Sequence, residues 1–234
     1  MMRICAIVLA AGKGARLKSK VSKPLVLLGR RPVLAYSLRL MAACPRVYSV
    51  IVAASRSNRR AVERCVAASR LKKPVIVVNG GARRQDSVRN ALRRIPRECG
   101  YVLVHDAARP FADARCLARL IRGVVATGAV IPAVPVKSTI KEVSPRSPGA
   151  CGIVRRTLER SMLREVQTPQ LFRKDIIVRA YQRHGARAAT DDAGLVEKLG
   201  VPVAVVAGSY DNIKITTPED LRAVRALLRA RSIR

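Results

Sequence analysis

The sequence predicts an α/β fold in which a mostly parallel sheet is covered by helices on both faces. Two observations predict it: short β-branched runs alternate with longer helical patterns along the chain, and the length is that of a single α/β domain. Strand and helix in strict alternation indicate parallel strands joined by crossover helices. With 234 residues the chain can bury one substantial core, so we expect a single domain over residues 1–234.

The first half of the chain contains four strand-helix pairs. Four short apolar runs predict the strands, namely RICAIVLA, VYSVIVAA, PVIVVNG and YVLVHDAA. The helices are predicted between and after them, in PVLAYSLRLMAA, NRRAVERCVAAS, RQDSVRNALRRI and DARCLARLIRGVVAT. Ligands of such sheets collect at the carboxyl ends of the strands, so the loops that follow the strands are the first place to look for a site.

The alternation of strand and helix patterns is interrupted after Ala129. The stretch AVIPAVPVKSTIKEV is rich in Val, Ile and Pro, and the turn-rich stretch SPRSPGACG follows it. We therefore expect residues 136–168 to form an insertion, a β-arm that projects from the core and reaches a partner subunit. The alternating pattern then returns, with a strand in DNIKIT and a last helix for which Thr217 is the predicted N-cap and Pro218 the first residue.

The stretch from Cys5 to Leu25 can be interpreted as a cleaved export signal or as a first buried strand that runs into a cationic loop. Signal peptides end in small neutral residues, whereas this loop carries five cations, Lys13, Arg16, Lys18, Lys20 and Lys23. No apolar run approaches the ~20 residues that a membrane span needs. We therefore predict a first strand over residues 3–10, a cytoplasmic protein and no membrane partner.

Charge and cysteine content restrict the possible functions. Lys and Arg number 46 against 15 Asp and Glu, a formal net charge of +31. This excess favours anionic partners, but the cations are spread through every helix and aromatic residues are only 3%, so a nucleic-acid platform is disfavoured. The six cysteines form no CxxC pair and only two histidines accompany them, which predicts reduced buried thiols and neither a zinc site nor a disulfide framework.

The loop after the first strand is the first candidate site. It comprises Ala10, Ala11, Gly12, Lys13 and Gly14. A glycine-containing turn lets backbone N–H groups approach phosphate oxygens. The spacing matches neither the P-loop nor the GxGxxG fingerprint, so an ordinary strand-to-helix turn remains an alternative. Arg16 and Lys23 in the same loop favour an anion, because crowding cations there is otherwise costly.

A second candidate is VLVHDAARP, where an apolar strand ends in Asp106 and Arg109 follows three residues later. The carboxylate can hold a metal or a hydroxyl, and the guanidinium can hold phosphate. The alternative is a surface ion pair within one turn. His105 is interpreted as a packing or hydrogen-bonding residue. Further along, Thr190 in TDDAG could cap a helix, and Lys214 lies within the apolar strand predicted in DNIKIT.

Taken together and in this order, LAAGKGAR, GGARRQDSVRNAL, VHDAARPF, EVQTPQLF, TDDAGLVEKLG and DNIKITTPEDL resemble the 2-C-methyl-D-erythritol 4-phosphate cytidylyltransferases of the non-mevalonate isoprenoid pathway. The resemblance spans nearly the whole chain. It implies a Rossmann-like core of the nucleotidyltransferase type and a homodimer locked by protruding β-arms. It also implies that CTP and methylerythritol phosphate give 4-diphosphocytidyl-2-C-methyl-D-erythritol and pyrophosphate, with Mg²⁺ required.

The resemblance also implies residue roles. Residues Ala10 to Gly14 match the loop around the CTP phosphates. Arg16 and Lys23 match the pair that stabilises charge on the α-phosphate. The positions that recognise cytosine and ribose are matched by Gly81, Arg84 and Ser87. Asp106 matches the residue that places substrate, CTP and metal. The remaining matches are substrate-binding positions: Arg109, Thr190 and Lys214 in the core, and Thr139, Arg160 and Thr168 from the arm, which serve the neighbouring subunit. Arg160 and Lys214 correspond to residues that orient the attacking phosphate.

Three stretches depart from the family pattern: SKPLV after the phosphate loop, KSTIK in the arm, and GGARR, where Ala82 stands at a position that is often acidic. Catalysis of nucleotidyl transfer needs positioning and charge stabilisation and no activated nucleophile, and none is arranged here. Two alternatives stay open. One is a ribitol 5-phosphate cytidylyltransferase with the same core, and the other is a basic nucleic-acid-binding protein without activity.

Overall fold

The computed structural model describes residues 2–12, 14, 17, 21–144 and 152–232. The strands are β1 (Ile4–Ala10), β2 (Leu27–Leu28), β3 (Arg31–Pro32), β4 (Val47–Ala54), β5 (Val75–Asn79), β6 (Tyr101–Asp106), β7 (Ala129–Pro135), β8 (Lys141–Ser144), β9 (Ile153–Thr157), β10 (Arg164–Val166), β11 (Gln170–Arg173) and β12 (Ala204–Ala207). The α-helices are α1 (Val33–Ala43), α2 (Arg59–Ala68), α3 (Arg84–Leu92), α4 (Ala114–Thr127), α5 (Lys174–His184), α6 (Ala193–Glu197) and α7 (Pro218–Ser232), with short 3-10 turns at Lys23–Leu25 and Arg160–Met162.

Eight strands form the main sheet, in the order β10-β7-β11-β6-β1-β4-β5, with β12 also paired to β7. The ladders β1·β4, β1·β6, β4·β5 and β12·β7 are parallel, whereas β10 and β11 run antiparallel to their neighbours. The sheet is therefore mostly parallel, as the sequence predicted. Strand β1 lies between β6 and β4, so the first residues of the chain form the middle of the sheet.

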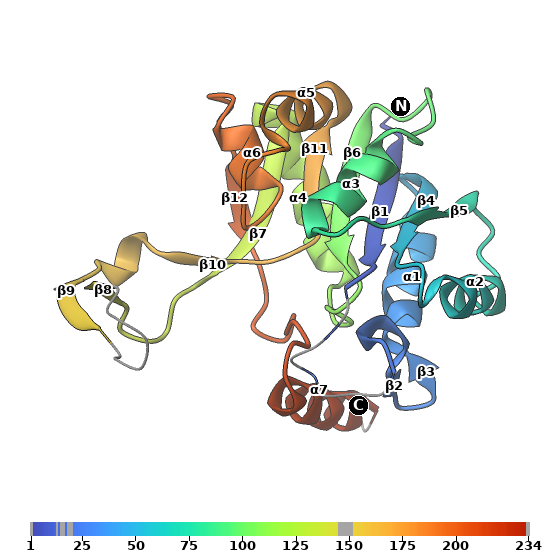
Figure 1. Cartoon of the computed structure of the whole chain (residues 1–234), viewed down its shortest axis with the longest axis horizontal. Helices are drawn as coiled ribbons and strands as arrows, with labels where there is room; N and C mark the ends of the chain where they lie inside the picture. The colour runs from blue at the N-terminus through green and yellow to red at the C-terminus, as the bar shows by residue number, and fades with distance from the viewer. Residues whose placement is uncertain (1, 13, 15–16, 18–20, 145–151, 233–234) are drawn as a thin grey trace.

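Alternate residues of β1 face opposite helical layers. Ala6 and Val8 pack in a core with α1, α2 and α4, whereas Cys5 and Ile7 pack in a second core with α3, α5 and α6. All four side chains are fully buried, which matches the continuous apolar run expected of a parallel strand covered on both faces. Figure 1 shows the two helical layers on either side of the sheet.

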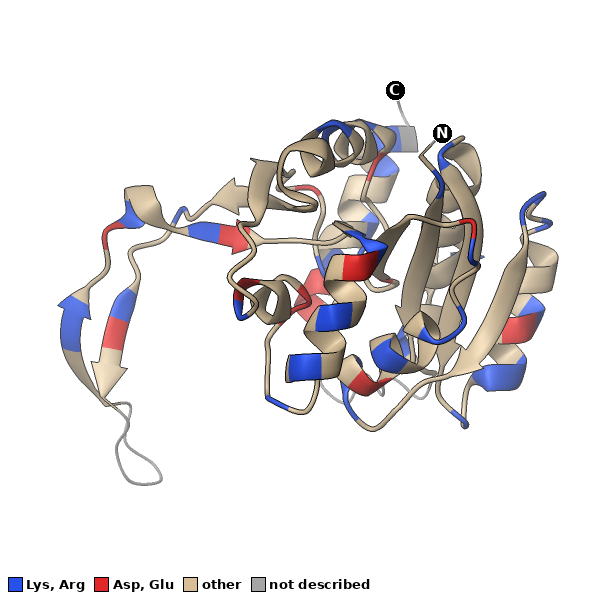
Figure 2. Ribbon diagram, turned by 90° about the horizontal axis from the view of Figure 1, so that it is seen from above, with Lys and Arg blue, Asp and Glu red and all other residues tan. Residues whose placement is uncertain are grey.

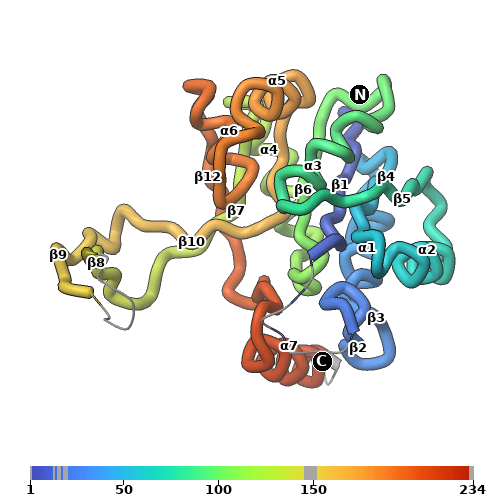
Figure 3. The backbone as a smooth tube through the Cα atoms, viewed as in Figure 1, coloured from blue at the N-terminus to red at the C-terminus, as the bar shows by residue number. Residues whose placement is uncertain are grey.

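Helix α7 closes the end of the molecule where the predicted site lies. Its Val224 packs in a third apolar cluster with Leu28, Val33 and Ile215, between the β2–β3 hairpin and the chain that leads to α7. The helix begins as predicted, because Thr217 Oγ1 accepts a hydrogen bond of 3.4 Å from the backbone N–H three residues later. Figures 1 and 3 show α7 beside β2 and β3, below the main sheet in these views.

The insertion predicted at residues 136–168 contains a separate two-stranded sheet, β8–β9, that has no ladder with the main sheet. Figure 3 shows this hairpin standing away from the rest of the chain. Strand β10, by contrast, pairs with β7 through Arg164 to Val166. The main sheet therefore resumes before the predicted insertion ends.

The strand predicted in DNIKIT is wrong. Residues 208–217 form no strand, although Ile215 is fully buried and donates one backbone hydrogen bond of 2.9 Å to Ala108 O. The alternation of Ile213 and Ile215 around Lys214 is typical of a strand. This extended segment crosses the sheet end instead of joining its edge, so the Lys214 side chain is 42% exposed and points at the site.

Helix α1 ends without a capping glycine, and a lysine from a distant loop caps it. Lys73 Nζ donates to the backbone carbonyl oxygens of Met41 at 3.2 Å, Cys44 at 2.5 Å and Val47 at 2.8 Å. Two of these carbonyls, of Met41 and of the C-cap residue Cys44, lie at the negative end of the helix dipole, and the third belongs to Val47 at the start of β4. Burial lowers the pKa of this half-buried lysine.

Lys and Arg residues are spread over the helices, as the blue segments of the ribbon in Figure 2 show. Among the described cysteines, four are buried and Cys44 is half-buried, and all five are free. Within the described part of the chain, no helix has both the length and the apolarity of a membrane span.

Candidate active site

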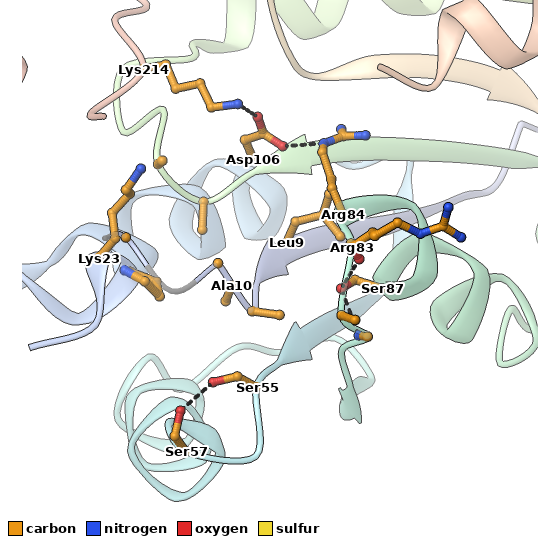
Figure 4. A pocket seen from close by; sticks show the side chains of 18 residues that line it. Leu9, Ala10, Lys23, Ser55, Ser57, Arg83, Arg84, Ser87, Asp106 and Lys214 are labelled. Atoms are coloured by element: carbon orange, nitrogen blue, oxygen red, sulfur yellow. Dashed lines mark hydrogen bonds and ion pairs between the residues drawn. The ribbon is translucent and has the colours of Figure 1, made fainter. Parts of the chain in front are cut away.

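A cavity of about 580 Å³ opens at the carboxyl ends of β1, β4, β5 and β6 (Figure 4). Such a position is where parallel α/β sheets bind their ligands. Its lining comprises Leu9, Ala10, Ala11, Gly12, Gly14, Lys23, Pro24, Ser55, Ser57, Gly81, Ala82, Arg83, Arg84, Ser87, Asp106, Ala107, Ala108 and Lys214. The predicted CTP-binding residues are therefore gathered in one place, apart from Lys13, which with the predicted catalytic Arg16 lies outside the described residues.

The loop after β1 and the turn between β5 and α3 meet in the cavity because both have small residues there. A Cβ atom at Gly80 would collide with Ala11 Cβ, and one at Gly81 would collide with Asp86 Cβ. The turn between β5 and α3 therefore lies directly against the loop after β1. Gly81 N–H donates to Ser87 Oγ at 3.0 Å, which fixes this turn on the first turn of α3.

Asn58 holds the two ends of the loop after β1. Its Nδ2 donates to Ala10 O at 2.9 Å and to Ser22 Oγ at 3.3 Å. Asn58 is buried at the start of α2, so the strand end, the loop end and the helix are joined through one amide. This amide therefore fixes Ala10 and Ser22, the two described ends of the loop, relative to α2.

A chain of four charged side chains crosses the cavity wall. Arg84 Nη2 lies 2.7 Å from Asp192 Oδ2, and Arg84 Nε lies 3.1 Å from Asp106 Oδ1. On its other oxygen, Asp106 is 2.6 Å from Lys214 Nζ. Tyr181 Oη donates to the second oxygen of Asp192 at 2.6 Å. Figure 4 shows Arg84 and Lys214 converging on Asp106 from opposite sides.

These contacts shift the proton affinities of the buried groups. Burial acts to raise the pKa of Asp106, but the cations of Arg84 and Lys214 outweigh it and hold this pKa well below its usual range. Burial acts to lower the pKa of Arg84, and the carboxylates of Asp192 and Asp106 raise it above its usual value. Burial and the neighbouring Asp192 raise the pKa of Tyr181. Asp106 is therefore an anion, and Arg84 a cation, at every physiological pH.

Charge on the cavity wall suits an anionic ligand. Four of the described lining side chains are cationic, Lys23, Arg83, Arg84 and Lys214, and one is anionic, Asp106. Lys23 stands on a short 3-10 turn at the far end of the loop after β1, across the cavity from Arg84 and Ser87 (Figure 4). The cavity therefore presents cations from three separate segments of the chain.

Behind Asp106 lies a buried polar cluster that includes two predicted substrate-binding residues. Thr168 Oγ1 accepts the Asp106 backbone N–H at 3.0 Å and lies 3.1 Å from His105 Nδ1. Arg109 Nη1 donates to Asn212 O at 2.6 Å. Burial lowers the pKa of His105 to about 4 and also lowers the pKa of Arg109. Neither Arg109 nor Thr168 lines the cavity.

The other predicted substrate-binding residues lie elsewhere in this chain. Thr190 lines a second cavity beside Gly194 and Lys198. Thr139 and Arg160 line a third one, at the base of the β8–β9 hairpin, and Arg160 Nη1 donates to Lys137 O at 2.8 Å. Within the described part of one chain, only Lys214 and Asp106 of the substrate-binding set reach the nucleotide-sized cavity.

Sequence reasoning missed several residues of the site. Ser55 and Ser57 line the cavity after β4 and their hydroxyls are 3.0 Å apart. Arg83 lines it as well and pairs with Asp86 at 2.9 Å. The carboxyl end of β4, one strand from β1, was the signal that could have found the two serines.

The side chains on the described cavity wall can coordinate a divalent cation only together with a bound nucleotide. Among the described residues no group of three or more His, Cys, Asp or Glu side chains gathers as a metal site. Asp106 is the one carboxylate on the described cavity wall. Mg²⁺ characteristically takes one or two carboxylates together with substrate phosphates and water. The site therefore fits a magnesium ion that arrives with a nucleotide, and does not fit a resident ion held by protein alone.

Comparison with known proteins decides the family. The family model IspD, 2-C-methyl-D-erythritol 4-phosphate cytidylyltransferase, matches residues 4–230. The chain belongs to this family. A cytidylyltransferase of that name from Pelotomaculum thermopropionicum is 44% identical, over 99% of this chain and 96% of its own length. One from Dehalococcoides mccartyi is 41% identical, over 97% of this chain and 96% of its own.

Solved structures of the cytidylyltransferase family share the fold. The 4-diphosphocytidyl-2C-methyl-D-erythritol synthase of Anaerococcus prevotii superimposes with a TM-score of 0.84 at 29% identity, over 97% of this chain and 99% of that one. The 2-C-methyl-D-erythritol 4-phosphate cytidylyltransferase of Thermus thermophilus gives a TM-score of 0.75 at 32% identity, over 97% and 100%. The described cavity thus belongs to a cytidylyltransferase scaffold.

Proposed function

We propose that this protein transfers the cytidylyl group of CTP to 2-C-methyl-D-erythritol 4-phosphate, giving 4-diphosphocytidyl-2-C-methyl-D-erythritol and pyrophosphate. The observation that carries the proposal is the cavity at the carboxyl ends of β1, β4, β5 and β6, where the predicted CTP-binding residues meet Lys23 and Lys214. Membership of the cytidylyltransferase family supplies the substrate names.

In the proposed complex the loop of Ala10, Ala11, Gly12 and Gly14 surrounds the CTP phosphates with backbone N–H groups, with Lys13 in the same loop. The nucleoside lies against Gly81, Arg84 and Ser87, on the turn held by the Gly81–Ser87 hydrogen bond. Arg84 is an orienting residue there, because both of its carboxylate partners hold its guanidinium in place.

The proposed reaction is an in-line displacement at the α-phosphorus. A phosphate oxygen of methylerythritol phosphate forms the new P–O bond, the bond from the α-phosphorus to the bridging oxygen breaks, and pyrophosphate leaves with that electron pair. The nucleophile is already an anion, so no side chain has to remove a proton. Lys23 and Arg16 neutralise the charge that grows on the α-phosphate, and Lys214 holds the incoming phosphate.

Asp106 is the proposed ligand for Mg²⁺, together with the nucleotide phosphates. A bound magnesium ion supplies charge neutralisation to the triphosphate. Asp106 itself positions Lys214 through the 2.6 Å ion pair. When a ligand draws Lys214 away from Asp106, the ion pair between Asp106 and Arg84 remains.

A homodimer is part of the proposal. On and near the β8–β9 hairpin four apolar side chains are exposed, Val143, Ile153, Val154 and Met162, at 48% to 80%. A two-stranded sheet is marginal alone, so apolar contact with a second copy would stabilise it. Thr139 and Arg160 lie at the base of this hairpin and are proposed to act in the active site of the partner subunit. Thr190 is proposed to act in the active site of its own subunit.

The proposed location is the cytoplasm. The stretch from Cys5 to Leu25, which could also be interpreted as an export signal, begins in the buried central strand β1 (Ile4–Ala10). Cleavage after this stretch would remove the middle of the sheet.

The decisive experiment measures pyrophosphate release by the purified protein with Mg²⁺ and CTP. Methylerythritol phosphate is compared with ribitol 5-phosphate, and ATP, GTP and UTP replace CTP in parallel. Release with CTP and methylerythritol phosphate alone supports the proposal. Pyrophosphate release with CTP and ribitol 5-phosphate alone would assign the protein as a ribitol 5-phosphate cytidylyltransferase. No release with any pair, together with a salt-sensitive shift of duplex DNA or RNA at near-physiological ionic strength, favours the nucleic-acid-binding alternative.

Sedimentation tests the dimer separately. A stable monomer at micromolar concentration in the active preparation would contradict a site shared between two subunits.

A further inference from the structure

His105 is a fully buried histidine directly before Asp106, and the proposed reaction gives it no role. It lies in β6 with its side chain behind the cavity wall, so it reaches no ligand there. A buried imidazole without a partner is costly, and this ring has one close side-chain partner, Thr168 Oγ1 at 3.1 Å from Nδ1.

The hydrogen bonds around Thr168 determine which ring nitrogen carries the proton. Thr168 Oγ1 accepts the Asp106 backbone N–H at 3.0 Å. A hydroxyl has one proton to give, and among the described residues the one acceptor placed for it is His105 Nδ1. Nδ1 is then the unprotonated nitrogen, and the ring proton lies on Nε2.

In this tautomer Nε2 is a buried donor, and the cost of leaving it without a full hydrogen bond is weighed against the cost of the other tautomer. Nε2 is buried and faces no acceptor with hydrogen-bonding geometry among the described residues, although the backbone of Arg109 lies close enough to interact with the ring. A Thr168 hydroxyl that donates to Nδ1 requires this nitrogen to be unprotonated, which leaves Nε2 as the nitrogen that carries the ring proton. A proton on Nδ1 would face the Thr168 hydroxyl, whose own proton would then lack an acceptor within the described part of the chain.

We propose that His105 is a positioning residue, which as the Nε2–H tautomer accepts the Thr168 hydroxyl proton and so aims the Thr168 oxygen at the Asp106 backbone N–H. The carboxylate of Asp106 is thereby held between Arg84 and Lys214. This inference rests on the proposed function for its effect on turnover, but not for the hydrogen bonds themselves.

A second pair of bonds extends the same cluster to Lys214. Asn212 Nδ2 donates to Thr168 O at 3.0 Å, and Arg109 Nη1 donates to Asn212 O. Lys214 lies two residues after Asn212 on a segment that has no sheet ladder to hold it. Thr168 therefore contacts, from its two ends, the backbone of Asp106 and the segment that carries Lys214. In this arrangement Thr168 acts through Asp106 and Lys214 and does not itself touch the nucleotide.

Two substitutions at one position separate the role of Nδ1 from the presence of a polar side chain. In His105→Asn the side-chain oxygen stands where Nδ1 stood and can accept the Thr168 proton. In His105→Gln the oxygen stands near the Nε2 position, too far along the side chain to replace Nδ1. We expect His105→Asn to retain most of the wild-type kcat, and His105→Gln to lose about 10-fold or more in kcat with KM for CTP changed much less, because a displaced carboxylate misaligns the reacting groups.

Thermal unfolding of both variants shows whether they are folded. A role in packing alone would make activity follow stability, with no difference between the two variants at equal stability. Equal kcat for His105→Asn and His105→Gln in folded protein would therefore overturn the proposal. Thr168→Ser, which keeps the hydroxyl, and Thr168→Val, which removes it, should repeat the same contrast.

A readout that needs no activity tests the tautomer. The chain has two histidines, so ¹⁵N-labelled imidazole spectra of the wild type and of His184→Gln assign the His105 signals directly. We expect an unprotonated Nδ1 and a protonated Nε2 at pH 7. A protonated Nδ1 would overturn the inference. If the wild type releases no pyrophosphate from CTP, the proposed function fails while this spectrum still decides the hydrogen bonds.

Discussion

Arg84 Nη2 lies 2.7 Å from Asp192 Oδ2, and the two residues are 108 positions apart in the chain. Asp192 has no exposed surface, whereas a quarter of the Arg84 side chain is exposed to the cavity. The pair therefore connects the hydrophobic interior below α6 with the wall of the nucleotide cavity. Stability and ligand binding are coupled at this guanidinium.

Arg84→Ala should cost about 3 kcal/mol of unfolding free energy, the lower end of what breaking a buried pair costs, because Arg84 is only partly buried. The loss has a clear cause: Asp192 would stay fully buried without its cation, and the Tyr181 hydroxyl would be left as its side-chain hydrogen-bond donor among the described residues. Chemical denaturation measures the loss. Arg94→Ala, an exposed arginine just beyond α3, is the matched control and should change the free energy by less than about 0.5 kcal/mol. Equal effects of the two substitutions would contradict the coupling.

Lys23→Ala should lower kcat for CTP turnover on the order of 10²-fold, by analogy with the loss of one preorganised donor to a developing anion. The side chain lines the cavity on the short turn that follows the loop after β1. Steady-state pyrophosphate release measures the effect. Lys72→Ala removes an exposed lysine that lies outside the nucleotide cavity and should leave turnover unchanged. Near-normal turnover of Lys23→Ala would remove this residue from the proposed mechanism.

Lys73→Met should destabilise the protein by about 2 kcal/mol without changing turnover, because two backbone carbonyls at the end of α1 and one at the start of β4 lose a charged donor. Lys72→Met is the adjacent control, since the Lys72 side chain is exposed; it should stay within about 0.5 kcal/mol. Urea denaturation measures the difference between the two variants. Equal urea midpoints for Lys73→Met and Lys72→Met would contradict a capping role of Lys73.

The buried thiols should resist alkylation in the native state. Burial raises the pKa of Cys5 to about 12 and that of Cys116 to about 11, so both are protonated at pH 8. Among the five described cysteines, iodoacetamide followed by peptide mass spectrometry should label Cys44 first, the half-buried one, and Cys5 and Cys116 only after unfolding. Labelling of Cys5 at the rate of Cys44 would contradict this burial.

The same pKa shifts predict a fall in stability at alkaline pH. In the unfolded chain these thiols ionise near their ordinary pKa of 9.0, whereas in the folded chain the pKa is about 12 for Cys5 and about 11 for Cys116. The unfolded state therefore releases protons first as the pH rises above 9, and stability declines from there. Unfolding free energies measured from pH 7 to pH 10.5 should show the decline, and Cys5→Ala should reduce its slope.

The sequence predicts those parts of the site that follow from local patterns. Strand ends are visible as the last residues of apolar runs, so the pattern alone places Ala10 and Asp106 at one sheet edge. Pairs distant in sequence leave no such trace: nothing local indicates that Arg84 reaches Asp192, or that Lys73 caps α1. Lys214 shows the opposite error, since a two-residue alternation is also satisfied by an extended segment that pairs with no strand.

Whether residues from two chains complete one site is a question of spatial arrangement that a sequence pattern cannot answer. Family resemblance predicts Thr139 and Arg160 in the site of a neighbouring subunit, and within one chain they lie apart from the nucleotide cavity. Their spacing relative to Lys23 depends on how a second copy docks, which local periodicity does not encode.

The spread of Lys and Arg residues over the helices has a consequence for assembly. Any association of two copies brings +31 against +31, and at about 0.15 M ionic strength the Debye length of about 8 Å screens only the more distant part of that repulsion. Added salt should therefore tighten self-association, while it weakens the attraction between the cavity and a triphosphate. The concentration of salt that maximises turnover would then be a compromise between two opposed ionic effects.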